Sequence, residues 1–240
     1  QYLMKKNWTQ WLLVVGERPE DRLYAAALRR AAGRFGGSIV AEKTWVATHE
    51  EGARTDQEEV AVFTQGVRYD VLLVADEAGA FGDKLPYRTW DPRPVGGTQG
   101  LTPTAWHPTL EQWAAAQLQS RFRKSAGRWM TSRDYAAWTA VRTVGEAATR
   151  SRSADFAALA RTIRSDDFEV AAFKGRKLSF RAWDGQLRQP IPVAWARSLV
   201  TMSPQDGFLH PRTELDTLGY DAPESGCRML TRTAPPSLVR

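Results

Sequence analysis

The chain of 240 residues is long enough for one large domain or for two lobes. It is 42% hydrophobic and 25% charged, which excludes a disordered chain, and no apolar run approaches the roughly 18 residues of a membrane span. The net charge of +6 favours an acidic partner, but arginines are spread through every segment, which is weak evidence for nucleic acid. The single cysteine, Cys227, excludes an internal disulfide framework and a cysteine zinc cluster.

Strands and helices alternate in the first half of the chain. Buried apolar runs predict strands at 11–15, 38–46, 69–75 and 95–98. Helices are predicted at 2–6, as the tail of a helix, at 21–35 and at about 55–65, after an acidic and polar run over 48–56. Strand–helix units of this spacing predict an α/β fold with an open parallel sheet and right-handed crossovers.

The second half is mainly helical and ends in loops. Amphipathic patterns predict helices at 111–126, 132–150 and 154–164, with Ser132 as the N-cap of the second. The run from 173 to 197 alternates, turns at Asp184-Gly185 and resumes, which predicts a hairpin. From Ser203 onward the chain is loop-like, and 232–240 is expected to be a loose tail.

No motif assembles a catalytic centre. The turn after Gly16 lacks both a dinucleotide and a P-loop fingerprint, and the chain has no GxSxG elbow. The histidines His49, His107 and His210 lie far apart without ligand spacing, and clustered carboxylates for a hard metal are absent. We therefore expect no enzyme, no metal and no resident cofactor.

The run from Arg88 to His107 is the strongest candidate for a ligand site. It combines prolines, three glycines (Gly96, Gly97 and Gly100) and two tryptophans, and it contains the strand predicted at 95–98. A strand that ends in a Gly-rich, aromatic-edged crossing is where an α/β protein usually places its ligand. A rigid surface loop is the simpler interpretation of the same composition.

The order of elements resembles the second lobe of periplasmic substrate-binding proteins of the branched-chain amino acid (type I) class. The helix that includes Asp134 resembles that class's long helix after the chain returns to the first lobe. This resemblance implies four segments. They are the second lobe at 1–101, a return to the first lobe at 102–185, a crossing back at 186–205 and a C-terminal extension at 206–240.

Three motifs resemble the subfamily associated with PQQ-dependent (quinoprotein) alcohol dehydrogenase systems. They run from Arg88 to His107, from Leu178 to Ile191 and from Leu215 to Cys227. The resemblance implies a periplasmic protein, peripheral to the membrane at most, that captures a small solute and presents it to an ABC permease. It also implies an earlier half of the first lobe and a signal peptide ahead of residue 1, both missing here. The alternative is a periplasmic accessory protein that docks on a quinoprotein dehydrogenase without carrying a solute.

The resemblance also implies which residues line the ligand. Strand ends would supply Asp76, Glu77, Thr98, Gln99 and Gly100. Amino-acid-binding members have an acidic residue near the position of Gln99, so an amino acid ligand is less expected. Trp90, Arg93, Trp106 and His107 suit a planar anion, because arginine binds carboxylates and indole stacks on rings. We therefore predict an anionic or aromatic ligand. The leading candidate is the flat tricarboxylate PQQ, which would be the transported solute and not a resident cofactor.

Overall fold

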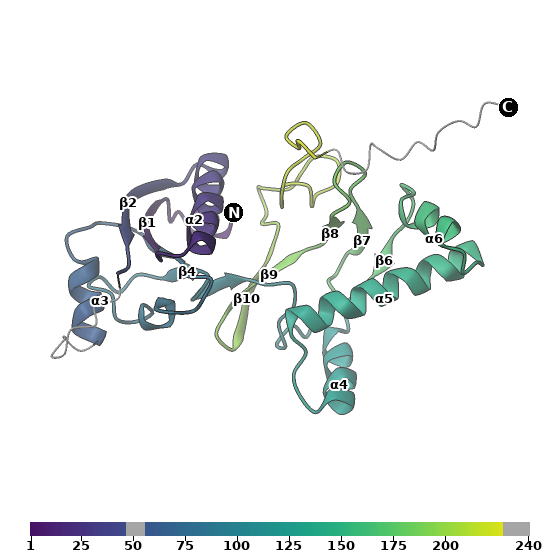
Figure 1. Cartoon of the computed structure of the whole chain (residues 1–240), viewed down its shortest axis with the longest axis horizontal. Coiled ribbons are helices and arrows are strands. Elements are labelled where there is room, and N and C mark those ends of the chain that lie inside the picture. Colours follow the sequence, from purple (N-terminus) through teal and green to yellow (C-terminus); the bar gives the residue numbers. More distant parts are fainter. Residues whose placement is uncertain (47–55, 228–240) are drawn as a thin grey trace. The chain divides into compact units, whose positions relative to one another are not determined.

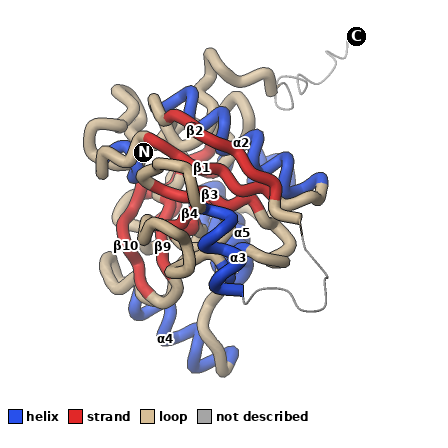
Figure 2. Tube along the Cα trace, turned by 90° about the vertical axis from the view of Figure 1, so that its left-hand side faces the viewer, coloured by secondary structure: helices blue, strands red, loops and turns tan. Residues whose placement is uncertain are grey.

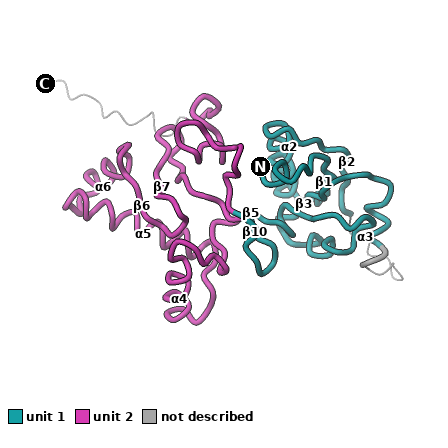
Figure 3. Tube along the Cα trace, turned by 180° about the vertical axis from the view of Figure 1, so that it is seen from behind, with its two compact units in different colours: residues 1–103, 193–201 teal, residues 104–192, 202–240 magenta. Residues whose placement is uncertain are grey.

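The structure, a computed structural model, describes residues 1–46 and 56–227 (Figure 1). The chain forms two compact units, shown in two colours in Figure 3. Unit 1 comprises residues 1–103 and 193–201, and unit 2 comprises 104–192 and the residues from 202 onward. Three features predicted from the sequence lie outside the described residues. They are the tail at 232–240, His49, and the polar run at 48–56 except for its last residue.

Unit 1 is built on a seven-stranded sheet of order β10-β9-β5-β4-β3-β1-β2. Its strands are β1 (Gln10–Val15), β2 (Ser38–Thr44), β3 (Val71–Ala75), β4 (Val95–Gly97), β5 (Leu101–Pro103), β9 (Ile191–Trp195) and β10 (Ser198–Ser203). The first five strands pair in parallel, and β9 pairs antiparallel with β5. Figure 2 shows β2, β1, β3 and β4 side by side. The predicted parallel α/β sheet is confirmed.

Both faces of β1 and β3 are buried, which explains the continuous apolar runs of these two strands. The helices of unit 1 are α1 (Tyr2–Lys5), α2 (Pro19–Phe35) and α3 (Asp56–Thr64), with a 3₁₀ turn η1 (Gly82–Lys84). Alternate residues of β1 and β3 enter two different cores. Leu12 and Val14 pack with Val60 of α3, whereas Leu13 and Val15 pack with Ala25 of α2.

Unit 2 combines three helices with a small antiparallel sheet of order β6-β7-β8. Its elements are α4 (Ala115–Ala126), α5 (Ser132–Ser151), α6 (Phe156–Ile163), β6 (Val170–Ala171), β7 (Lys177–Phe180) and β8 (Leu187–Arg188). The predicted hairpin is confirmed, since β7 and β8 pair antiparallel around the turn at Asp184-Gly185. The amide of Gly185 donates to the carbonyl of Arg181 at 2.8 Å, which closes this turn.

One predicted helix cap and one predicted helix start in unit 2 are wrong, whereas α5 does begin at Ser132 as predicted. Helix α5 has Thr131, not Ser132, as its N-cap, because the hydroxyl of Thr131 accepts from the amide of Asp134 at 3.3 Å. Helix α4 begins at Ala115 and not at 111, since Trp113 and Ala114 have positive φ angles of 54° and 62°. A left-handed backbone cannot continue a right-handed helix.

Candidate functional site

The carboxyl ends of β1, β3 and β4 meet at one edge of the unit 1 sheet, because the three strands are parallel. This edge, which we call the strand-end edge, consists of the residues that follow each strand: 16–18, 76–77 and 98–99. It is where open α/β sheets bind ligands. Gly16 is required there, since a Cβ atom at this position would lie 2.2 Å from a carboxylate oxygen of Asp21.

Asp21 joins two of the three loops at the strand-end edge. Its side chain is buried, and its two oxygens accept from the amide of Arg18 at 3.1 Å and from the amide of Glu77 at 2.8 Å. The first bond caps α2, and the second ties that helix to the end of β3. Sequence reasoning missed this residue, although an acidic residue in the first turn of a helix is a recognisable capping signal.

Asp76, a predicted ligand residue, holds a loop of its own chain. It is 1% exposed, and its carboxylate accepts three backbone hydrogen bonds, from Ala80 at 2.9 Å, Phe81 at 2.8 Å and Gly82 at 2.7 Å. These bonds occupy both oxygens. Asp76 therefore shapes the edge of the sheet, and its carboxylate is committed to the backbone.

Thr98 and Gln99 complete the same network from the end of β4. The hydroxyl of Thr98 accepts from the amide of Asp76 at 3.0 Å, and the side-chain amide of Gln99 donates to the carbonyl of Asp76 at 3.0 Å. Gln99 packs directly on Gly82, where a Cβ atom would come within 2.1 Å of the amide oxygen of Gln99. The structure thus brings Asp76, Thr98 and Gln99 together as predicted neighbours.

Glu77 presents the exposed carboxylate at the centre of this edge. Its side chain is exposed, as is that of Glu17 after β1. Burial raises the pKa of the neighbouring Tyr24 to about 12, and the negative charge of Glu77 contributes to the same shift. The strand-end edge therefore offers hydrogen-bond acceptors with negative charge.

Gly100 has a conformational role. Its φ angle is 76°, and a Cβ atom there would lie 2.2 Å from the carbonyl oxygen of Val95. The residue allows the chain to turn from β4 into β5.

Trp90 and Arg93 lie at the opposite edge of the sheet from Thr98. Both residues precede β4, and the amide of Trp90 donates to the hydroxyl of Thr64 at 2.9 Å, at the end of α3. The charge of Arg93 acts on Tyr69, before β3, whose pKa burial raises. Five residues of extended chain from Arg93 to Thr98 span roughly 16 Å. The structure therefore does not bring Trp90 and Arg93 to the strand-end edge.

Trp106 and His107 belong to unit 2. The indole of Trp106 is 2% exposed, stacks on Tyr135 with ring centroids 4.8 Å apart and donates to Gln119 at 3.1 Å. It packs in the interior and offers no accessible ring face. The imidazole of His107 lies 2.8 Å from the hydroxyl of Thr109.

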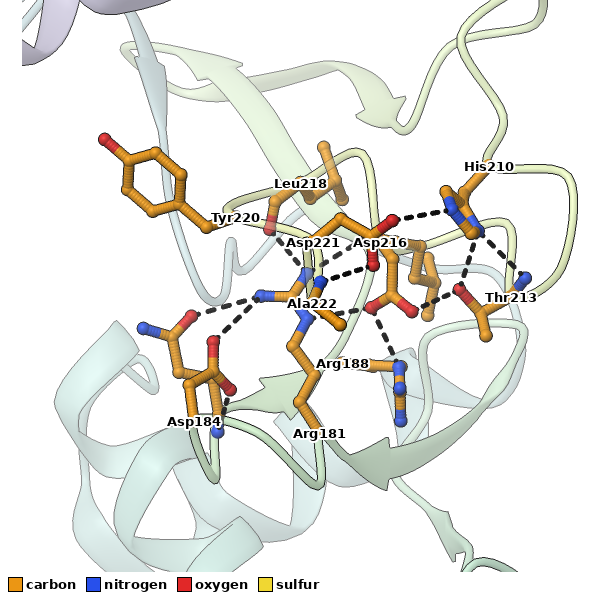
Figure 4. Close-up of polar contacts among 12 residues, drawn as sticks. Arg181, Asp184, Arg188, His210, Thr213, Asp216, Leu218, Tyr220, Asp221 and Ala222 are labelled. Carbon is orange, nitrogen blue, oxygen red and sulfur yellow. Dashed lines mark hydrogen bonds and ion pairs between the residues drawn. The ribbon is translucent and has the colours of Figure 1, made fainter. Parts of the chain in front are cut away.

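The second and third sequence motifs meet in unit 2 at a buried ion cluster (Figure 4). Arg181 and Arg188, from the motif at 178–191, both donate to the same oxygen of Asp216 at 2.8 Å. Burial alone would raise the pKa of Asp216, but hydrogen bonds from Arg188, Thr213 and Arg181 lower it to about 2. Both motifs were identified in the sequence, but no role was assigned to their residues. The structure gives them one, since they join the β7–β8 hairpin to the 203–227 loop.

Among residues 1–46 and 56–227, no group of three metal-ligating side chains could hold a metal ion. Within the same residues, no helix is long and apolar enough to cross a membrane.

Comparison with known proteins identifies the fold. No protein-family model and no curated protein matches the chain. A periplasmic binding protein from Burkholderia mallei is similar over 94% of this chain and 64% of its own, with a TM-score of 0.64 and 13% identity. A branched-chain amino acid ABC transporter periplasmic ligand-binding protein from Burkholderia xenovorans is similar over 90% and 62%, with a TM-score of 0.67 and 14% identity.

A third similar structure was solved with a ligand. It is a solute binding protein of an ABC transporter from Rhodopseudomonas palustris in complex with 3,4-dihydroxybenzoic acid, with a TM-score of 0.57 and 14% identity. The match covers 84% of this chain and 60% of that one. The chain thus spans less than two thirds of the length of each of these three structures. Its fold is that of the type I periplasmic binding proteins of the branched-chain amino acid ABC transporter class.

Proposed function

We propose that this chain forms one wall of a small-molecule site in a periplasmic solute-binding protein that serves an ABC transporter. The observation that carries the proposal is the strand-end edge of unit 1. There, hydrogen bonds hold three loops in place through the side chains of Asp21, Asp76, Thr98 and Gln99. The side chain of Glu77 remains exposed between these loops. A preformed polar edge of this kind can meet a ligand with little reorganisation. The likeness in fold supports the same function.

The exposed groups at this edge favour a ligand with hydrogen-bond donors. Glu17 and Glu77 are carboxylates, which accept hydrogen bonds strongly from hydroxyl or ammonium groups. Arg18, exposed after the same strand as Glu17, can pair with a single carboxylate. A small hydroxylated aromatic acid has both features. A protein of this fold has been solved with 3,4-dihydroxybenzoic acid, which is consistent with this ligand class.

The finer assignment, to PQQ and quinoprotein alcohol oxidation, rests on the three sequence motifs. PQQ is a planar tricarboxylate, and Glu17 and Glu77 would repel its carboxylates at the strand-end edge. PQQ therefore stays the ligand that the motifs predict, with a quinoprotein dehydrogenase as the predicted partner. The exposed carboxylates favour the hydroxylated acid, and the two ligands can be compared directly.

Isothermal titration of the intact protein tests the proposal. We expect 3,4-dihydroxybenzoate to bind and benzoate, which lacks the hydroxyl donors, to bind at least about tenfold more weakly. Glu77→Gln should weaken binding of the dihydroxy acid by about tenfold, because a charged acceptor is lost. Glu111→Gln, which removes an exposed carboxylate in unit 2, is the matched control and should bind normally.

Two results would overturn parts of the proposal. Tighter binding of PQQ than of either benzoate would refute the ligand class and support the motif-based assignment. A folded protein that binds none of these compounds, nor leucine, would refute solute capture and favour the alternative of an accessory interaction protein.

A further inference from the structure

Unit 2 contains a groove of about 950 Å³ with no part in the proposed ligand site. It lies between α4, α5 and the 171–177 segment, which leads from β6 into β7. We call it the α4–α5 groove. Its floor is apolar and closed, since Leu118 and Met130 are 7% and 1% exposed.

One wall of the groove is an open helix face with the spacing of a helix-packing site. Val141, Gly145 and Thr149 follow each other at intervals of four residues on α5. Val141 is 74% exposed, and nothing lies within 4 Å of the place that a Cβ atom would take at Gly145. Rows at i, i+4 are the ridges and grooves into which a second helix packs. The groove is therefore open where a helix could approach most closely.

A strained tryptophan forms the opposite lip of the groove. Trp113 and Ala114 are consecutive left-handed residues without being glycine, which costs free energy unless the surroundings impose it. The indole of Trp113 lies against Gly175, where a Cβ atom would come within 2.4 Å of the ring. It is nevertheless 46% exposed. The backbone thus holds a large aromatic side chain half open at the rim.

The rim of the groove is positively charged. Arg121, Arg142, Arg176 and Lys177 line it, although Arg176 forms an ion pair with Glu214 and Lys177 one with Glu169. Its acidic lining residue, Glu146, is already shared between Arg142 and Arg150, at 3.7 Å and 2.9 Å. Among the described residues, Arg121 forms no ion pair. The outer surface of α4 adds Arg123 and Lys124, both exposed.

We propose that the α4–α5 groove binds an amphipathic helix that carries acidic residues beside its apolar face. The apolar floor, the i, i+4 row and the exposed indole suit the apolar face of a helix. The basic rim selects acidic flanks by charge complementarity. This interaction uses unit 2 alone and does not depend on solute capture at unit 1.

A pair of synthetic peptides tests the charge and shape requirements together. Both are 18-residue helices with leucine on one face; one has glutamate on its flanks and the other has lysine at the same positions. We expect fluorescence anisotropy on the 240-residue chain to show at least about tenfold tighter binding of the glutamate peptide at 0.15 M salt.

Three variants make the test specific. The double variant Arg121→Glu/Arg142→Gln should abolish or reverse the preference. Arg133→Glu/Arg161→Gln changes the net charge equally at exposed positions outside the groove and should keep it. Gly145→Trp should prevent binding of both peptides and still fold, because the space at Gly145 is open and glycine weakens a helix.

Equal binding of the two peptides, or a preference that survives Arg121→Glu/Arg142→Gln, would refute the proposal. So would displacement of the glutamate peptide by micromolar dodecanoate, which would assign the groove to a small amphipathic anion instead.

Discussion

Adjacent acidic residues at the end of β3 have opposite roles. Both residues follow the last residue of β3, and only Asp76 turns into the protein, where the loop at 80–82 binds its carboxylate. Asp76 is 1% exposed and accepts three backbone hydrogen bonds, whereas Glu77 is exposed. The sequence presents an Asp-Glu pair and nothing that separates the members. Only the position of the loop at 80–82 decides which of the two carboxylates remains exposed.

Removing Asp76 should therefore cost much more stability than removing Glu77. Asp76→Ala leaves three amides, two of them buried, without an acceptor, and we expect the free energy of unfolding to fall by roughly 3 kcal/mol. Glu77→Ala should change it by no more than about 0.5 kcal/mol, as for other surface changes. Urea denaturation of both variants measures this difference, and similar losses would contradict the assigned roles.

Asp216 should make unit 2 sensitive to acid. Its pKa is lowered to about 2, so its charged form contributes stability above the unfolded value near 4 that is lost as the pH falls through 2. We expect a loss of about 2 kcal/mol over this window from this group. Asp216→Asn should lower stability at pH 7 and flatten the acid dependence. An unchanged acid profile in this variant, followed by circular dichroism, would refute the role.

Lys174 should give a second rise of stability with pH, in the neutral to alkaline range. Burial lowers its pKa to about 7, although its ammonium donates to Gln189 at 2.6 Å and to the carbonyl of Pro190 at 3.0 Å. Between pH 7 and 10 the unfolded chain binds the extra proton, so the free energy of unfolding rises with pH, by at most about 1.4 kcal/mol per unit. Lys174→Met should remove this slope. Urea denaturation at pH 7 and 9 measures the pH dependence of the free energy of unfolding in the parent protein and in Lys174→Met. An equal slope in the two proteins would contradict the role of Lys174.

At the scale of elements, strands and helices with a single strong pattern could be predicted, and those set by long-range pairing could not. The apolar runs of β1 and β3 and the amphipathic pattern of α5 are local signals. By contrast, β5 has three residues, and β9 is defined by pairing with β5 from about 90 positions away, with Leu101 opposite Trp195. No local period reveals such a partner.

The start of α5 was predicted from its local pattern, whereas its N-cap residue was not, and the observed cap can be tested. Thr131 and Asp134 form a reciprocal capping box, in which the amide of Thr131 donates to Asp134 at 2.8 Å. Thr131→Ala should lower the free energy of unfolding by about 1 kcal/mol, and Thr131→Ser, which keeps the hydroxyl, should restore most of it. Thermal unfolding measures both variants, and equal effects of alanine and serine would contradict the cap.

At the scale of the whole molecule, the topology of the sheet places residues of the predicted site at different edges. A parallel connection must return to the amino edge before the next strand begins, so Trp90 and Arg93 lie before β4 and Thr98 lies after it. Trp106, only eight positions beyond Thr98, already belongs to unit 2. Within unit 1, nearness in sequence therefore did not bring Trp90 and Arg93 to Thr98, whereas the strand ends at Asp76, Thr98 and Gln99 did meet.

The division into two units predicts two separable unfolding transitions. Unit 1 has its own sheet core around Leu12 and Leu72, and unit 2 buries Tyr135, Phe168 and Leu178. Chains with several compact units commonly deviate from two-state unfolding. In differential scanning calorimetry, Asp76→Ala should lower one transition, and Asp216→Asn should lower the other, each by several degrees. A single transition shifted by both variants would mean that the units unfold as one cooperative body, because a defect in either would then destabilise both.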